Sequence, residues 1–102
     1  MGWQVDWSKR GDYVRSRHSV EADWADEAVI DEHAVWLTPD PASRSGHAVR
    51  VIGYSTTARS VLTVILVDPE ADPSEPPDGE WWGANAWIAN EGDRRLYGEE
   101  DL

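Results

Sequence analysis

Apolar and polar residues alternate near the start of the chain and again in its second half, a pattern typical of strands with one buried face. In residues 3–7, WQVDW, the odd positions are apolar and the even positions polar. Residues 47–54 and 60–67 are two further predicted strands, and the short polar link between them predicts a hairpin. Because SVLTVILV is almost continuously apolar, residues 60–67 are expected to form a central strand covered on both faces. Residues 81–90 are the last predicted strand.

Two helices are predicted between the first strand and the hairpin. Ser8 can cap a helix that runs through Arg17, and Ser19 can cap a second helix that ends near His33. The apolar residues of the second helix recur at the spacing of one helical face: Trp24, Ala25, Ala28 and Val29. A short third helix or tail is expected over residues 91–98.

This order of elements predicts an α+β domain. We expect a RelE-like, four-stranded, mainly antiparallel sheet packed against two N-terminal helices, with a short C-terminal helix. A further strand between the second helix and the hairpin is left open. A chain of 102 residues has room for one core, so residues 1–102 are expected to be a single domain.

The absence of cysteine favours a reducing compartment and excludes disulfides and thiolate metal sites. The N-terminus lacks the apolar region of a signal peptide, and no apolar run approaches the length of a membrane span. We therefore expect a cytoplasmic protein that does not enter a membrane. His18, His33 and His47 have no metal-ligand spacing, so neither a metal nor another cofactor is expected.

The formal charge of −11 is unfavourable for a general nucleic-acid binder. The acidic residues are concentrated, however. Residues 68–80 contain six acids and four prolines, and the tail over residues 98–102 contains three more acids. Without these nine the charge is −11 + 9 = −2, and the remaining body carries every Lys and Arg. The loop is expected to be exposed; whether it is a linker, a docking site for a basic partner or a lid is left open.

The last strand, WWGANAWIAN, contains a tryptophan where a core residue is not expected. Strict alternation puts Trp82, Ala84, Ala86 and Ile88 on the core face and Trp81, Asn85 and Trp87 on the other. An aromatic side chain beside an amide on the open side of a sheet is typical of a contact surface. These three residues are therefore a candidate partner surface, and they make self-association into a homodimer a further expectation.

The N-terminal segment VDWSKRGDYVRSRHSVEADWADEAV has a Trp-containing strand, Lys9 in the predicted first helix, an Arg17–His18 pair at its end and an Ala-rich acidic second helix. RVIG, from Arg50 to Gly53, and the apolar VLTVILV follow. In this order the elements resemble the BrnT-type toxins of bacterial type II toxin–antitoxin pairs, which are small ribonucleases with a RelE-like fold. The resemblance covers about nine-tenths of the chain by element order.

The closing segment NAWIANEGDRRLY fits the family's end pattern without a gap. Asn85 stands for a serine, Trp87 for an arginine and Ala89 for an alanine. An acid, two arginines and a tyrosine then follow at Asp93, Arg94, Arg95 and Tyr97. The resemblance implies a metal-independent ribonuclease that is neutralised by an antitoxin with a ribbon-helix-helix part. An acidic toxin would favour an antitoxin with a basic toxin-binding segment.

On this resemblance His18, Arg50 and Tyr97 are the candidate catalytic residues. Candidate RNA or phosphate contacts are Lys9, Arg17, Arg94 and Arg95. Each has a plainer interpretation: His18 as a helix-terminal histidine, Arg50 as a cross-strand partner, and the last cluster as an exposed helical turn. Because Trp87 cannot supply a positive charge to a phosphorane, the alternative is a catalytically inactive relative that acts as a protein-binding or regulatory module.

Overall fold

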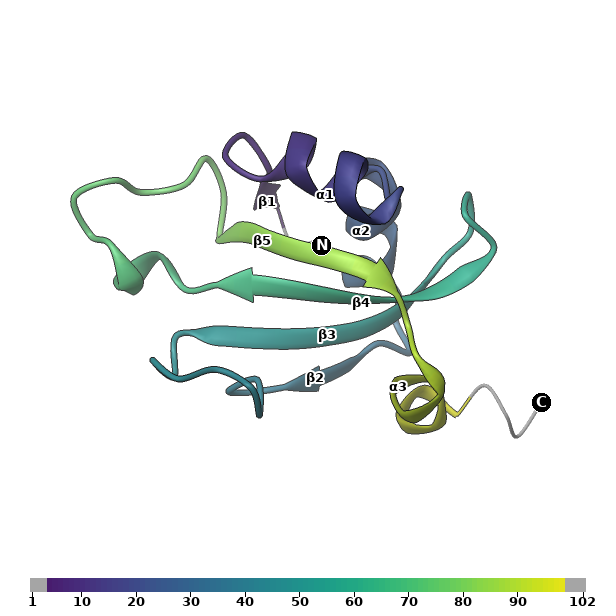
Figure 1. Ribbon diagram of the computed structural model, residues 1–102. Coiled ribbons are helices and arrows are strands. Elements are labelled where there is room, and N and C mark those ends of the chain that lie inside the picture. Colours follow the sequence, from purple (N-terminus) through teal and green to yellow (C-terminus); the bar gives the residue numbers. More distant parts are fainter. Residues whose placement is uncertain (1–3, 99–102) are drawn as a thin grey trace.

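A five-stranded sheet is the centre of the computed structural model, which describes residues 4–98 (Figure 1). The strands lie in the order β1-β5-β4-β3-β2. β3, β4 and β5 are antiparallel neighbours, β2 is antiparallel to β3, and β1 is parallel to β5. Their bounds are β1 Val5–Asp6, β2 Val35–Leu37, β3 Ala48–Ser55, β4 Ser60–Val67 and β5 Trp81–Ile88.

The α+β class and the hairpin of β3 and β4 are confirmed, and β4 is the middle strand. The predicted strand number of four is wrong, because the sheet has a fifth strand, β2, at the place left open between the second helix and the hairpin. The sheet is mainly antiparallel as predicted, with one parallel pairing between β1 and β5. β2 has only three residues, too few for a recognisable alternation, and it is held by its register with β3. Trp3 and the acidic tail beyond residue 98 lie outside the described residues.

Three helices cover the sheet: α1 Gly11–His18 and α2 Ala22–Ile30 on one face, and α3 Glu91–Tyr97 on the other (Figure 1). The predicted starts of the first two helices are wrong. Ser8 lies in a turn and its backbone N–H donates to Asp6, so α1 begins three residues later. Ser19 is the left-handed C-cap of α1, with φ 57°, and Glu21 is the N-cap of α2. None of the helices in residues 4–98 is long and apolar enough to cross a membrane.

The larger core lies between the sheet and the pair α1 and α2. It contains the predicted face of α2 together with alternate residues of β3 and β4: Ala25, Ala28, Val29, Val49, Val51, Leu62, Val64 and Leu66. The α2 backbone lies directly on β3 at Gly53, where an added Cβ would be 2.0 Å from the carbonyl oxygen of Ala28. The ring of Trp7 lies on Gly83 in the same way, where an added Cβ would be 2.4 Å from Trp7 Cδ2. Both glycines therefore permit a close approach between layers.

A smaller core lies under α3. Ile52 of β3, Val61 of β4 and Ala89 are buried there, with Tyr54 and Tyr97 packed around them. α3 packs mainly on β3 and β4, so it covers part of this face. The remaining residues of the face are half-buried, and we call them the open face: Ile65, Val67, Trp82, Asn85 and Trp87. The expectation that β4 is covered on both faces is thus met only in part.

β5 contains a bulge that strict alternation could not anticipate. Ile65 pairs with Asn85 but Leu66 pairs with Gly83, so Ala84 has no partner in the ladder. The bulge puts Trp81 on the helix-side core, where its ring lies 5.9 Å from that of Trp36. The prediction that Trp81 shares a face with Asn85 and Trp87 is therefore wrong, because one extra residue reverses the side-chain direction.

Candidate functional site

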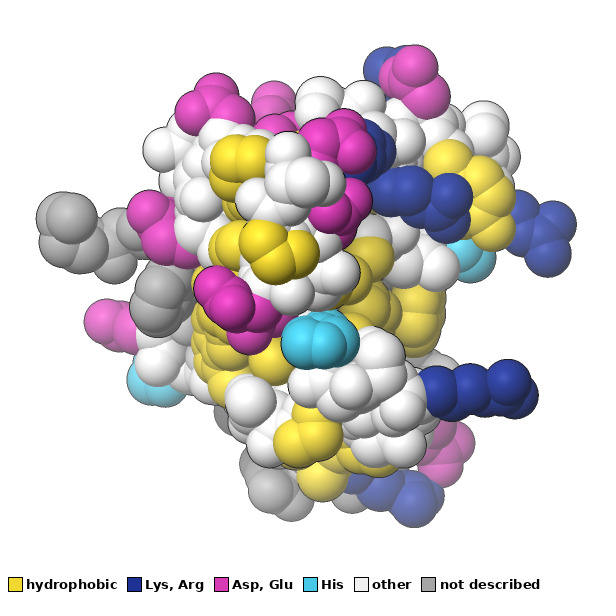
Figure 2. All heavy atoms as spheres, turned by 90° about the vertical axis from the view of Figure 1, so that its left-hand side faces the viewer, with side chains coloured by type: hydrophobic (Ala, Val, Ile, Leu, Met, Phe, Trp, Pro, Cys, Tyr) yellow, Lys and Arg dark blue, Asp and Glu magenta, His cyan; other side chains and the backbone are white. Residues whose placement is uncertain are grey.

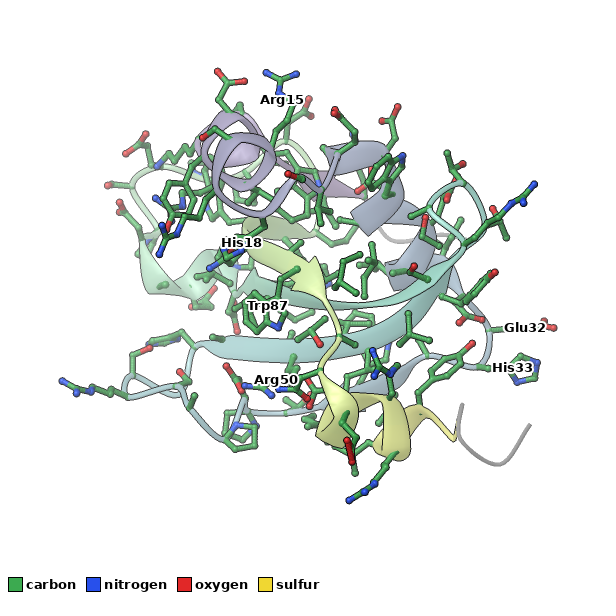
Figure 3. The ribbon with its side chains drawn as sticks, turned by 45° about the vertical axis from the view of Figure 1, so that its right-hand side comes forward. Arg15, His18, Glu32, His33, Arg50 and Trp87 are labelled. Carbon is green, nitrogen blue, oxygen red and sulfur yellow. The ribbon has the colours of Figure 1, made fainter. Side chains whose placement is uncertain are left out.

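The open face is bordered by the end of α1, which brings His18 against Trp87. Their ring centroids are 5.9 Å apart with the planes tilted by 49°, and the ring of Tyr13 meets His18 edge-on at 6.3 Å. Figure 3 shows His18, Trp87 and Arg50 one below the other, from α1, β5 and β3. The fold thus brings together two residues separated by most of the chain, one a candidate acid or base and the other a candidate partner contact.

Arg50 lies at the side of the open face, where it is enclosed by two carboxylates. Its Nε donates to Asp40 Oδ1 at 3.0 Å, and its Nη1 lies 3.3 Å from both oxygens of Asp93. Asp40 is 6% exposed and Asp93 5% exposed, and Thr63 donates to Asp93 at 2.6 Å. The guanidinium is therefore committed to a buried ion-pair network that joins the loop before β3 to the start of α3.

This network explains why α3 lies where it does. Asp93 is in the first turn of α3, and its backbone N–H is capped by the Asn90 side chain at 2.9 Å. A carboxylate in the first turn is favoured by the helix dipole. The same carboxylate accepts from Thr63 of β4 and pairs with Arg50 of β3. Asp93 therefore fixes the helix to two strands at once.

Lys9 lies at the other end of the open face, in the turn before α1 and not in the helix as predicted. Its Nζ is 4.3 Å from the centre of the Trp82 ring and 3.1 Å from Glu75 Oε1. Glu75 belongs to the loop of residues 68–80, most of which are exposed. Asp78 of the same loop donates its backbone N–H to Asp6, and this bond is the first cause that lowers the pKa of Asp6. The acidic loop is thus tied to the N-terminal segment.

The other candidate phosphate contacts are spread over the surface. Arg17 is exposed on α1. On α3, Arg94 donates to the Ala89 carbonyl at 2.9 Å and Arg95 pairs with Glu91 at 2.7 Å. Figure 2 shows most Lys and Arg side chains along its right-hand margin, and acidic side chains mainly at the top and left. On the face that Figure 2 shows, basic side chains are therefore gathered toward one side, although the total charge is strongly negative.

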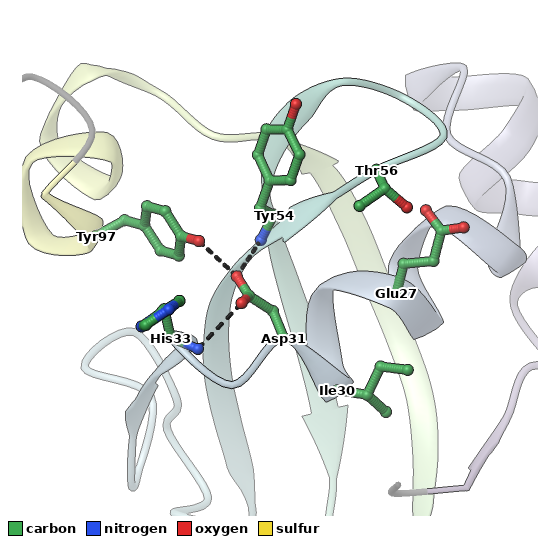
Figure 4. Close-up of a pocket in the computed structure, with 7 residues that line it drawn as sticks. All are labelled: Glu27, Ile30, Asp31, His33, Tyr54, Thr56 and Tyr97. Carbon is green, nitrogen blue, oxygen red and sulfur yellow. Dashed lines mark hydrogen bonds between the residues drawn. The ribbon is translucent and has the colours of Figure 1, made fainter. Parts of the chain in front are cut away.

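Tyr97 does not lie on the open face with His18. Its hydroxyl donates to Asp31 Oδ2 at 2.5 Å, in a pocket of about 390 Å³ between the end of α2, the β3–β4 hairpin and α3 (Figure 4). The backbone N–H groups of Tyr54 and His33 also donate to Asp31, at 2.8 and 3.0 Å. Burial raises the pKa of Asp31, but the hydrogen bonds, led by that of Tyr97, outweigh it and hold the pKa below its usual value.

The sequence reasoning missed four carboxylates that organise these sites: Glu27, Asp31, Asp40 and Asp93. Asp93 is predicted only as the acid of the family's end pattern and not as a partner of Arg50. Asp31 stands after an apolar helical run, a position at which a cap is expected, and this was the available signal. Nothing in the sequence marks Asp40 as a partner of Arg50, because the pairing depends on the path of the loop before β3.

In residues 4–98 no three His, Asp or Glu side chains are grouped as metal ligands would be. The candidate catalytic residues occupy three environments: His18 against Trp87, Arg50 between two carboxylates, and Tyr97 on Asp31. Comparison of the chain with protein-family models, with curated proteins and with solved structures finds no match.

Proposed function

We propose that this protein is a BrnT-like binding module without ribonuclease activity, and that the open face around Trp87 binds its protein partner. The observation that carries the proposal is the environment of Arg50. A phosphate-binding arginine needs a guanidinium that is free to meet an anion, whereas Arg50 already meets Asp40 and Asp93. An incoming phosphate would be repelled by these two carboxylates and would find only the Nη2 donors of Arg50 without a hydrogen bond to them.

The other candidate catalytic groups support the same conclusion. Cleavage at a 2′-hydroxyl needs a base, an acid and a cation around one phosphate. His18 is adjacent to Trp87, which stands where the resembling toxins have an arginine and which carries no charge. The Tyr97 hydroxyl donates to a carboxylate in a separate pocket. The three candidate catalytic residues thus have three different sets of contacts.

The open face has the chemistry of a protein-binding surface. Two half-buried tryptophans, Trp82 and Trp87, flank Asn85 on the sheet, with apolar Ile65 and Val67 beside them. Aromatic residues are enriched at interfaces because they bury a large apolar area and lose little conformational entropy. The partner that the resemblance implies is an antitoxin with a ribbon-helix-helix part and a basic toxin-binding segment; a second copy of the chain is the other partner we propose.

The test is the affinity for a candidate antitoxin, measured by isothermal titration calorimetry. Trp87→Ala should weaken binding by about tenfold or more, as expected for a central aromatic contact. Leu96→Ala is the matched control, because Leu96 is exposed on α3 and is not one of the open-face residues. Equal affinity of wild type and Trp87→Ala would contradict the proposed surface. Sedimentation of the free chain, with the same two variants, tests the homodimer.

Ribonuclease activity is the second candidate function, and one observation favours it. His18 and Arg50 border the same open face, with Trp87 between them, so an RNA base could stack on the tryptophan (Figure 3). In that case His18→Ala should abolish cleavage of RNA. Arg50→Ala is a poor test of catalysis, since it also removes the cation of a buried network.

A further inference from the structure

The pocket at Tyr97 holds two negative charges that no Lys or Arg neutralises within the described residues. Glu27 and Asp31 are separated by four residues at the end of α2, so they lie on the same side of the helix. Neither forms an ion pair with a Lys or Arg of residues 4–98. Like charges at this spacing repel each other, and a cation placed between them would remove the repulsion.

Neutral donors keep both carboxylates ionised. The Thr57 hydroxyl, the Thr57 backbone N–H and the Ser55 hydroxyl all donate to Glu27, and these bonds, led by that of the Thr57 side chain, lower its pKa. The pKa of Asp31 is also below its usual value, since three hydrogen bonds outweigh the effect of burial. Both side chains are therefore charged at neutral pH.

Asp31 still has room for a further donor. An ionised carboxylate offers about four acceptor positions, and three hydrogen bonds reach Asp31. Glu27 accepts from Thr57 and Ser55, and a hydrogen bond from the Thr56 side chain also lowers its pKa, so Glu27 contributes its charge to the pocket. Figure 4 shows Asp31 beside Tyr97, Tyr54 and His33, and Glu27 beside Thr56, both lining the pocket. A cation in the pocket can therefore donate to Asp31 and is also attracted by the charge of Glu27.

The rest of the lining suits a flat cation with an apolar stem. Tyr54 and Tyr97 contribute aromatic rings, and aromatic rings attract cations, arginine most often. Ile30, which is 55% exposed, lies at the pocket and offers apolar surface to an aliphatic chain. The nearest basic lining residue, His33, faces solvent with 77% of its side chain exposed. A volume of about 390 Å³ accommodates one long side chain with water around it.

We propose that this pocket binds the guanidinium of an arginine side chain from a basic segment of a protein partner. Arginine fits better than lysine because its planar group presents donors in several directions and stacks on aromatic rings. The net charge of −11 favours a basic partner through the long-range field as well. The pocket lies apart from the open face, so the inference does not rest on the function proposed for Trp87.

The test is an NMR titration of the ¹⁵N-labelled full chain with a short alanine-rich peptide that contains one arginine. The matched control peptide has citrulline in its place, which keeps the shape and removes the charge. The arginine peptide should shift the backbone amides of residues 30–33, 54–56 and 97, and the citrulline peptide should bind about tenfold or more weakly. Equal binding of the two peptides, or shifts elsewhere, would overturn the proposal.

Two variants at Ile30 complete the experiment, because this residue is exposed and its replacement removes no hydrogen bond. Ile30→Lys places a competing cation at the pocket and should weaken binding of the arginine peptide by about tenfold. Ile30→Gln, a neutral side chain of similar length, should retain binding within about threefold. Unchanged binding by Ile30→Lys would count against the pocket. Binding of free arginine amide but not of the peptide would refute a protein partner.

Discussion

Replacement of Arg50 by methionine should destabilise the fold strongly, since it leaves two buried carboxylates without their cation. Asp40 and Asp93 are 6% and 5% exposed, and Arg50 is the basic residue paired with both. Removal of one partner from a buried ion pair costs about 3–5 kcal/mol. A domain of this size is stable by about 5–15 kcal/mol in total. The loss is therefore expected to be about a fifth or more of the free energy of unfolding.

The assay is urea unfolding at neutral pH, followed by tryptophan fluorescence. Arg95→Met is the matched control, because Arg95 forms an exposed i,i+4 pair with Glu91 and such pairs contribute only about 0.3–0.5 kcal/mol. The double variant Arg50→Met, Asp93→Asn should recover part of the lost free energy of unfolding, since it also removes the charge of one of the two unpaired carboxylates. A cost below about 1 kcal/mol for Arg50→Met would refute the buried network and leave Arg50 available to bind phosphate.

Two further predictions concern contacts elsewhere in the fold. Gly53→Ala should cost about 3 kcal/mol or more in urea unfolding, because the new Cβ would lie 2.0 Å from the Ala28 carbonyl oxygen, whereas Gly92→Ala, with 3.5 Å to its nearest neighbour, should be close to neutral. Tyr97→Phe should lower the free energy of unfolding at neutral pH by about 1.5–3 kcal/mol, the range for a hydrogen bond to a charged group. Because Asp31 has a lowered pKa, its contribution is present above the ordinary value of 3.8 and is lost as the pH falls further, so wild type and Tyr97→Phe should converge in acid.

The elements that depend on local pattern could be predicted from the sequence. The β3–β4 hairpin follows from two apolar runs and a short polar link, and the buried face of α2 follows from its apolar spacing. The helix ends could not be predicted as well, because Ser8 and Ser19 are equally good candidates for several turn and cap positions. In the structure Ser19 ends α1 in the left-handed conformation, where serine has no special preference.

The arrangement of the candidate site depends on contacts between distant segments. The bulge at Ala84 is tied to Arg10, whose Nε donates to the Ala84 carbonyl at 3.1 Å across 74 positions of the chain. The sequence pattern of the last strand does not predict this bulge. The bulge nevertheless decides which side of the sheet Trp81 occupies. The partners of Arg50, Asp40 and Asp93, come from a loop and from the start of a helix. The sequence therefore indicates the arginine but not the two carboxylates that pair with it.

The central claim is that this protein binds a protein partner and does not cleave RNA. It is tested most directly by incubating the purified chain with total RNA and following the integrity of the RNA by electrophoresis, beside the variants His18→Ala and Trp87→Arg. We predict that wild type and His18→Ala leave the RNA equally intact. A gain of cleavage by Trp87→Arg would show that only the cation is missing. Cleavage by the wild type that is lost in His18→Ala would contradict the claim.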